Sequence, residues 1–518
     1  MPSRWTYIAF ALGLVSATGF APLDLWPLTL ICLAAWMHLV WKADTLKTAL
    51  ARGYAFGIGH FIVGLNWIAG AFQYQDAMPV WLGWIAVVAL SFYIAIYPAA
   101  AAGLAWRWGR GRPAAFVLFF AAAWVVTEWL RAVVFTGFAW NPLGVVWATV
   151  PFISEISRTI GTYGLSGLIV LSGGLLGYRV NRLRDDLGVE RSVAAFSLVV
   201  ALAVIWFSFV IWPMFGERSD ENGPLIRVVQ PNIGQQDKYE PGYDAINFDK
   251  LKRLTGKPGP EPRLILWPEA AIPDYLDEKG GEARYGRWRI AALLGPKDMI
   301  ITGGVKREFK VTRRANYIER DLIGARNNVW AMTPNQQLLW RYDKAHLVPY
   351  GEYLPMKPLL SAIGLSRLVP GDIDFWPGPG PQSYNVPGFG KVGLQICYEI
   401  VFSGEVIDRD NRPDFLFNPS NDAWFGAWGP PQHLAQARLR AIEEGIPIVR
   451  ATPTGISAVI DADGRVLNSI PLGEAGFIET HMPTPHPPTL FARYGNILPF
   501  AFALFLTAIG VALRRRPR

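Results

Sequence analysis

The sequence predicts a bundle of about eight transmembrane helices that carries one folded α/β domain outside the cytoplasm. Of the 518 residues, 51% are hydrophobic and only 17% are charged, whereas roughly 25% are charged in an ordinary soluble protein. Apolar runs fill the first 214 residues and return near the C-terminus. Between them, short β-rich runs alternate with amphipathic helical segments, which is typical of a layered α/β domain.

The apolar runs are the predicted transmembrane spans. Each approaches the roughly 20 residues that a helix needs to cross a bilayer. The first run could be taken for a signal peptide. Six further spans precede the middle segment, so we expect this run to be retained as a helix. The spans are predicted at 5–20, 26–41, 53–72, 79–106, 113–134, 159–178, 193–214 and 494–513.

Basic residues fix the orientation of these spans, because positive charge stays on the cytoplasmic side of the membrane. They follow every second span, whereas the alternate loops 21–25 and 73–78 contain none. The segment 215–492 follows an odd-numbered span and is therefore expected on the periplasmic side of a bacterial inner membrane. The cytoplasmic residues are Lys42, Lys47, Arg52, Arg107, Arg110, Arg112, Arg179, Arg182, Arg184, Arg191, Arg514, Arg515, Arg516 and Arg518.

These patterns divide the chain into three parts. We expect transmembrane helices 1–7 in residues 1–217, a periplasmic catalytic domain in 218–488, and helix 8 with a basic cytoplasmic tail in 489–518. Residues 218–513 hold 32 basic and 32 acidic side chains. The net charge of +8 therefore lies in the membrane loops and the tail, which argues against nucleic acid as a partner.

The middle segment supplies the predicted α/β elements. Asp461 to Gly464 (DADG) lies between two apolar runs and predicts a hairpin turn. Helices are predicted at 281–294, 401–408 and 432–445. Strands are predicted at 226–229, 264–267, 299–302, 328–332, 392–396, 415–418, 448–451 and 457–460.

Three side chains at the ends of apolar segments are candidates for chemistry. Glu269 follows a strand and a proline, Lys344 opens the segment KAHLVPYGE, and Cys397 ends an apolar strand at a predicted strand-to-helix turn. A thiol nucleophile needs a base for its proton and donors for the oxyanion. A partly buried carboxylate can serve as the base, and a lysine can hold the oxyanion and the thiolate. The other cysteine, Cys32, lies in an apolar run, and the two cysteines give no metal-ligand spacing.

The segments around Glu269, Lys344 and Cys397 resemble those of the apolipoprotein N-acyltransferases, which are membrane-bound members of the nitrilase or carbon–nitrogen hydrolase superfamily. The resemblance extends over nearly the whole chain. The resemblance also rests on the segments 128–131, 135–138 and 418–426. It implies an αββα sandwich for the periplasmic domain. It also implies Glu269 as general base, Lys344 as oxyanion-stabilising lysine and Cys397 as acyl-accepting nucleophile.

Further residues match the family around this set. Tyr239 stands where the family often has a tryptophan, which puts the detail of that substrate contact in doubt. For Glu352 and Glu399, a supporting salt bridge and a direct chemical role are equally open. The matching residues that support the site or bind substrate are Glu352, Tyr398, Glu399, Asn328 and Tyr239.

The resemblance implies lipoprotein maturation by a ping-pong acyl transfer. A phospholipid would be the acyl donor and a diacylglyceryl-modified apolipoprotein the acceptor, with no metal or organic cofactor. We expect a monomer in the lipid bilayer. Two alternatives remain: a membrane-tethered nitrilase-type amidase acting on a small amide, and a non-enzymatic membrane scaffold.

Several polar residues are expected to be structural. His346 is interpreted as a packing residue, His433 as a structural residue at the start of a helix, and 421–422 as ordering a loop. Glu128 and Arg131 lie three apart on one predicted helix and are expected to pair with each other. The apolar segment 354–370 is expected to form an arm that dips into the outer leaflet.

Overall fold

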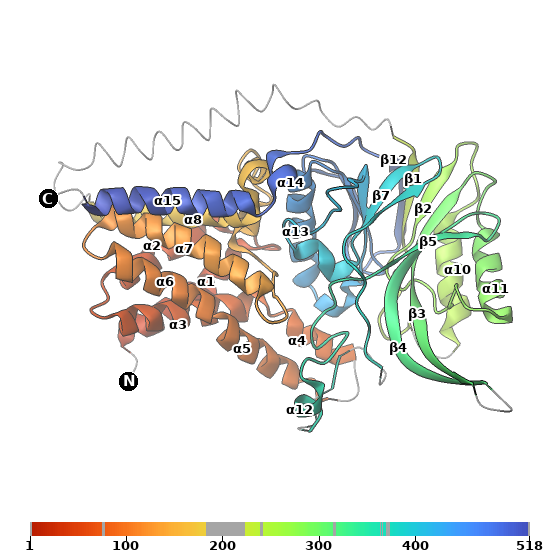
Figure 1. The fold of residues 1–518 in the computed structure, drawn as a ribbon, viewed down its shortest axis with the longest axis horizontal. Helices are drawn as coiled ribbons and strands as arrows, with labels where there is room; N and C mark the ends of the chain where they lie inside the picture. The colour runs from red at the N-terminus through yellow and green to blue at the C-terminus, as the bar shows by residue number, and fades with distance from the viewer. Residues whose placement is uncertain are drawn as a thin grey trace.

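The computed structural model describes residues 3–74, 78–182, 223–238, 242–313, 318–362, 364, 366–368 and 373–515. Figure 1 shows two parts next to each other, a bundle of helices and a pair of β-sheets flanked by helices. The N-terminal helices and the last helix form the bundle, and the chain between them forms the sheets. Tyr239 and the predicted span 193–214 lie outside the described residues.

Long apolar helices build the bundle, and α15 returns to lie along α7 and α8 (Figure 1). Helices α1 and α3 approach closely because glycines face the contact. A Cβ added at Gly13 would lie 2.1 Å from the carbonyl oxygen of Phe56, so a larger residue would separate the helices. The bundle helices are α1 (Arg4–Ser16), α2 (Trp26–Trp41), α3 (Leu46–Gly64), α4 (Ile68–Ala71), α5 (Leu82–Ile94), α6 (Ile96–Gly109), α7 (Pro113–Val133), α8 (Ser157–Arg182) and α15 (Ile497–Arg515).

Several of these helices can cross a membrane. Within the described residues, four are long and apolar enough: Leu82–Gly109, Pro113–Val133, Ser154–Gly177 and Ile497–Arg515. Helix α3 and the segment Ile68–Tyr74, bent by 49°, would add a fifth if they form one span. Helices α1 and α2 have 13 and 16 residues, fewer than the roughly 20 that a full crossing needs. The number eight therefore stays a prediction.

The rest of the described chain forms two six-stranded sheets. The first has the order β12-β1-β2-β3-β4-β5, and the second has the order β11-β10-β9-β8-β7-β6. The strands are β1 (Leu225–Gln230), β2 (Arg263–Leu266), β3 (Met299–Arg313), β4 (Ile318–Met332), β5 (Leu338–Asp343), β6 (Ser383–Val386), β7 (Gly390–Leu394), β8 (Phe415–Pro419), β9 (Ile448–Ala451), β10 (Ser457–Ile460), β11 (Val466–Ile470) and β12 (Gly476–His481).

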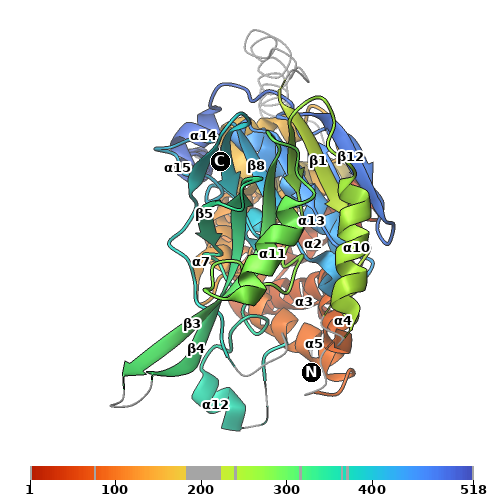
Figure 2. The ribbon, with the colours of Figure 1, turned by 90° about the vertical axis from the view of Figure 1, so that its right-hand side faces the viewer.

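The two sheets pack face to face between helices. Helices α10 (Tyr243–Thr255) and α11 (Gly281–Ala291) cover the outer face of the first sheet, as Figure 2 shows. Helix α13 (Gly429–Glu444) lies between the second sheet and the bundle (Figure 1). Strand β1 contacts β9 and β10 across the interior. The layers are thus helix, sheet, sheet, helix, in agreement with the expected αββα sandwich.

The predicted strands all fall on observed strands, with ends shifted by a few residues, and the predicted hairpin turn joins β10 to β11. The predicted helix over 401–408 was wrong. The chain instead forms a short 3₁₀ helix, η7 (Cys397–Val401). It leaves helical geometry at Phe402, and Gly404 has φ of +82°, which a glycine adopts without steric cost.

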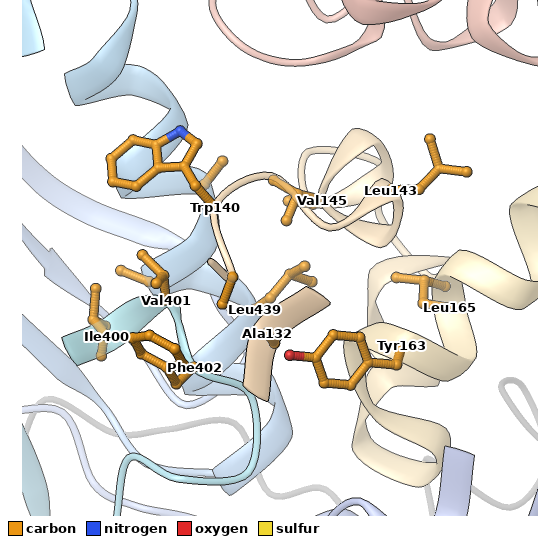
Figure 3. Packing of buried hydrophobic residues seen from close by; sticks show 14 of the residues in the cluster. Ala132, Trp140, Leu143, Val145, Tyr163, Leu165, Ile400, Val401, Phe402 and Leu439 are labelled. Carbon is orange, nitrogen blue, oxygen red and sulfur yellow. The ribbon is translucent and has the colours of Figure 1, made fainter. Parts of the chain in front are cut away.

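The nucleophile segment packs directly on the helical bundle. In Figure 3, Ile400, Val401 and Phe402 lie in one buried cluster with bundle residues that include Trp140 and Tyr163. The two parts of the molecule therefore share a hydrophobic core beneath the η7 segment.

Buried polar contacts reinforce this junction. Glu443 of α13 accepts hydrogen bonds from the backbone N–H and hydroxyl of Thr162 in α8, at 2.6 and 2.7 Å. Its Oε1 also accepts from Ser403 at 2.7 Å, and its Oε2 lies 2.8 Å from Nε of Arg440. Because one buried carboxylate joins a bundle helix to the chain after the nucleophile, the site is held at a fixed place relative to the bundle.

Candidate active site

Cys397 stands on a sharp turn between β7 and η7. Its backbone has φ of +53°, a conformation that costs about 1–3 kcal/mol for a residue with a Cβ. The surroundings enforce it. The carbonyl oxygen of Cys397 accepts hydrogen bonds from His433 Nε2 at 3.1 Å and from Asn418 Nδ2 at 3.3 Å. Strain of this kind is typical of a residue that is held for function.

A buried ion network lies beneath this turn. Asp422 bonds to Nδ1 of His433 at 2.9 Å and to Arg450 at 2.7 Å. Arg450 also donates to Asn418 at 2.6 Å. Burial, and the charge of Arg450, lower the pKa of His433. Because the ring bonds the Cys397 carbonyl and not its sulfur, His433 supports the turn, as the sequence suggested, and is not positioned as a base for the thiol.

Glu269 follows β2 and presents one free carboxylate oxygen to the site. Its Oε1 accepts a hydrogen bond from Asn327 Nδ2 at 2.6 Å and lies 3.9 Å from Nζ of Lys344. Its Oε2 is buried and has no hydrogen-bond partner among the described residues. A buried polar atom without a partner needs an explanation. An oxygen that receives a proton during a reaction has this geometry.

Lys344 follows β5 and is 1% exposed. Its Nζ lies 3.0 Å from Oε1 of Glu352. Burial alone would lower the pKa of Lys344, but the carboxylates of Glu352 and Glu269 outweigh burial and hold the pKa above its usual value. Lys344 is therefore an ammonium ion at neutral pH and can stabilise an oxyanion.

The Cys397 thiol needs help to ionise. Burial raises its pKa well above the usual value, and the Glu269 charge raises it further. The charge of Lys344 and the backbone N–H of Asn421 act in the opposite direction. Since the thiolate is the nucleophile, a base must take the proton as the thiol attacks.

Glu399 joins the cysteine turn to the lysine segment. Its Oε1 accepts from Tyr342 OH at 2.9 Å and from the backbone N–H groups of Ala345 and His346 at 2.7 and 3.1 Å. Its Oε2 accepts from the N–H of Ile396 at 2.6 Å. Burial raises the pKa of Glu399 to about 7. The carboxylate has four protein donors, so it positions the segments that carry Lys344 and Cys397.

We expect Glu399→Gln to slow acylation of Cys397 by about 10- to 100-fold. Both oxygens of Glu399 accept hydrogen bonds, and the glutamine would replace one of them with an NH₂ group, which cannot accept a hydrogen bond from the N–H that faces it. The variant should still fold and bind lipid. The rate of acyl-enzyme formation in single-turnover experiments measures the effect. An unchanged rate would show that these four hydrogen bonds do not govern the position of the thiol.

Of the other predicted site residues, Glu352 contacts the catalytic candidates, whereas Asn328 does not. Oε1 of Glu352 bonds Lys344, and its Oε2 accepts from the N–H of Val348 at 2.8 Å. Asn328 is fully buried on β4, and its side chain makes no hydrogen bond among the described residues. Its neighbour Asn327, which the sequence interpretation missed, bonds both Glu269 and Glu352.

Tyr398 faces the helical bundle. Its ring is nearly parallel to that of Trp140, with centroids 6.4 Å apart, and its edge meets Phe402 at 5.2 Å. The ring of Trp140 also contacts that of Trp67, with centroids 4.4 Å apart. A row of neighbouring aromatic rings therefore runs from the residue after the nucleophile into the bundle.

These rings lead to a groove of about 450 Å³ between α4, α5 and the segment after β8. Tryptophans dominate its wall, and Trp81 and Trp84 are more than half exposed. Tryptophan is enriched where a membrane meets water. The groove lining includes Trp67, Trp81, Trp84, Trp428, Asn66 and Gln73.

Glu128 and Arg131, which were expected to pair, interact through their charges but make no direct ion pair within 4.0 Å of each other. Glu128 Oε1 accepts from the N–H of Leu143 at 2.8 Å. Arg131 donates to the carbonyl oxygens of Trp140 and Asn141 at 2.8 and 3.3 Å. Both side chains hold the loop that carries Trp140 beside Tyr398.

Two family models and many known proteins match this chain. Residues 12–175 match the family described as the apolipoprotein N-acyltransferase N-terminal domain, and residues 226–484 match the carbon-nitrogen hydrolase family. The apolipoprotein N-acyltransferase of Rhodopseudomonas palustris is 33% identical to this chain, with 98% of this chain and 95% of the relative aligned. This chain belongs to the apolipoprotein N-acyltransferase family.

A second member of the apolipoprotein N-acyltransferase family, from Haemophilus ducreyi, is 31% identical over 98% of this chain and 97% of its own length. Among solved structures, Saccharomyces cerevisiae Nit3 of the nitrilase superfamily has a TM-score of 0.34 and 18% identity, covering 52% of this chain and 92% of Nit3. Membership of the family therefore rests on relatives that align over nearly the full chain.

Proposed function

We propose that the protein transfers an acyl chain from a phospholipid, through a thioester on Cys397, to the α-amino group of the diacylglyceryl-modified N-terminal cysteine of a lipoprotein. Membership of the apolipoprotein N-acyltransferase family supports this substrate pair. In this proposal Glu269 is the general base, and Lys344 with backbone N–H groups stabilises the oxyanion. Glu352 and Asn327 position these two groups.

The reaction has two steps. In the first, Oε2 of Glu269 accepts the thiol proton while the Cys397 sulfur bonds to the ester carbonyl carbon. The ester C–O bond breaks, the lysophospholipid oxygen takes the proton, and a thioester remains. In the second, the α-amine of the acceptor attacks the thioester and gives a proton to Glu269. The C–S bond then breaks, and the sulfur recovers that proton.

One observation distinguishes this proposal from that of a soluble hydrolase. The nucleophile segment packs on the bundle, and the rings of Trp140 and Trp67 connect it to a groove that contains several tryptophans. We propose that an acyl chain of the donor lies in this groove. Both substrates are held in the bilayer, so they reach such a site by lateral diffusion. A dry, lipid-facing site also favours the amine over water as the second nucleophile.

The proposal includes the arrangement in the cell. We place residues 1–217 and 489–518 in the inner membrane and residues 218–488 in the periplasm, because basic loops remain on the cytoplasmic side. We expect the chain to act as a monomer. Helix α12 (Lys357–Ala362) has no buried residue, and Leu359 is 62% exposed. This exposure supports an arm that dips into the outer leaflet.

The decisive experiment supplies purified protein with a phospholipid that carries a labelled acyl chain and a diacylated lipopeptide with a free N-terminal amine. We expect one labelled chain on that amine, detected by mass spectrometry. The same lipopeptide with an acetylated amine is the matched control and should gain nothing. Release of ammonia from small amides, without transfer to either peptide, would instead favour the tethered amidase.

A further inference from the structure

We propose that Lys238 is a further functional residue of this site, whose ammonium group offsets the negative charge that develops on Cys397 and the acyl oxyanion. The role in the oxyanion step rests on the proposed acyl transfer. The family resemblance assigns no role to Lys238, which precedes Tyr239. The position of Lys238 in the site depends on how the loop after β1 folds against Glu269.

A pinned loop delivers Lys238 to the site. Asn232 Nδ2 donates to the Gly473 carbonyl at 2.7 Å, and Asn421 Nδ2 donates to Oε1 of Gln235 at 2.8 Å. Asn247 Nδ2 donates to the carbonyl of Asp237 at 3.0 Å. A loop tied to three separate elements has little freedom, so the position of the next side chain is fixed.

Lys238 reaches from this loop to the base. Its Nζ donates to the backbone carbonyl of Glu269 at 3.2 Å. It also lines the cleft beside Glu269, together with Pro231, Ile233 and Pro268. The cleft is also lined by the carboxylates of Glu269 and Asp244, so the Lys238 ammonium faces both acidic and apolar groups there.

The three charged groups that contact one another beside the thiol carry one excess negative charge. Glu269 and Glu352 each carry one negative charge, and Lys344 carries one positive charge, which leaves a net charge of −1. Transfer of the thiol proton to Glu269 only moves this charge onto the sulfur and then onto the oxyanion. An uncompensated charge in a buried site is costly. The ammonium of Lys238 brings the sum to zero before and after the transfer.

The surroundings of Lys238 keep it charged at neutral pH. Loss of solvent lowers its pKa to about 8, while the charges of Glu269 and of a Cys397 thiolate act in the opposite direction. Cys397 itself faces Glu269, Lys344 and Asp422. Lys344 contacts two carboxylates, Glu352 and Glu269. Lys238 adds a second ammonium on the Glu269 side of the site, where its charge interacts with that of a Cys397 thiolate.

Alkylation of Cys397 by iodoacetamide tests this role without any acyl substrate. The experiment uses the full-length protein with Cys32→Ala, so that Cys397 is the remaining thiol, and follows the rate by intact mass from pH 6 to 10. In Lys238→Met we expect the rate at pH 7 to fall about tenfold, and we expect the difference from the parent to shrink above pH 8, where Lys238 loses its proton. Lys238→Arg keeps the charge and should stay within about threefold of the parent.

Lys252→Met removes an exposed lysine from α10 and serves as the control, with no expected change. An unchanged alkylation profile in Lys238→Met would overturn the proposal. So would equal impairment of the methionine and arginine variants, because charge would then not be the property that matters. Failure of acyl transfer in the parent protein, with alkylation still dependent on Lys238, would overturn the proposed function and leave this inference standing.

Discussion

Replacing Cys397 with alanine is expected to abolish the acyl-enzyme completely. The described residues around the site offer no second thiol, because Cys32 is buried in α2 of the bundle. After incubation with a defined phospholipid, the parent protein should gain the mass of one acyl chain, and hydroxylamine should remove it. The alanine variant should keep its original mass under every lipid condition. Intact-mass spectrometry measures both.

Two further variants make this result specific to the thiol. Cys32→Ala should acylate at the rate of the parent protein, because its side chain takes no part in the site. Cys397→Ser should form far less adduct, because an alcohol ionises much less readily than a thiol and Glu269 must remove its proton. An adduct that persists in Cys397→Ala would place the acyl chain on another residue and would contradict the proposed intermediate.

The sequence made Glu269, Lys344 and Cys397 candidates because each stands at the end of an apolar segment, and the family resemblance implied their roles. Glu269 and Lys344 follow β2 and β5 of the first sheet, and their charged groups lie 3.9 Å apart. Cys397 follows β7 of the second sheet, so only the packing of the two sheets brings it to the other two residues. The sequence did not show which of the two neighbouring asparagines, Asn327 or Asn328, faces the site. Adjacent residues of a strand face opposite sides, and the choice between Asn327 and Asn328 depends on the register of β4. That register contains an irregularity between Ala331 and Met332, which no local pattern indicates.

Other features depend on contacts between distant segments. Glu128 and Arg131 have the spacing of a helical ion pair, yet each bonds the loop that returns from α7. Lys238 lies in no motif, and three hydrogen bonds from other parts of the α/β domain bring it to Glu269. Local patterns thus predicted the elements and the nucleophile, whereas long-range hydrogen bonds determine which neighbouring groups complete the site.

Lys344→Met is expected to damage both the chemistry and the fold. Removing a charged oxyanion donor should slow acylation by about 100- to 1,000-fold. The change also leaves the carboxylates of Glu352 and Glu269 buried without their shared cation. Breaking a buried ion pair in this way costs about 3–5 kcal/mol of stability. Acyl-enzyme formation and thermal unfolding in detergent measure the two losses separately.

A second substitution separates these losses. In Lys344→Met with Glu352→Gln, one buried charge is removed along with the lysine, so much of the lost stability should return. The acylation rate should stay low, because the oxyanion still lacks its ammonium partner. If the double variant recovered both stability and rate, Lys344 would serve only to neutralise Glu352, and the oxyanion would have to be stabilised by backbone N–H groups and Lys238 alone.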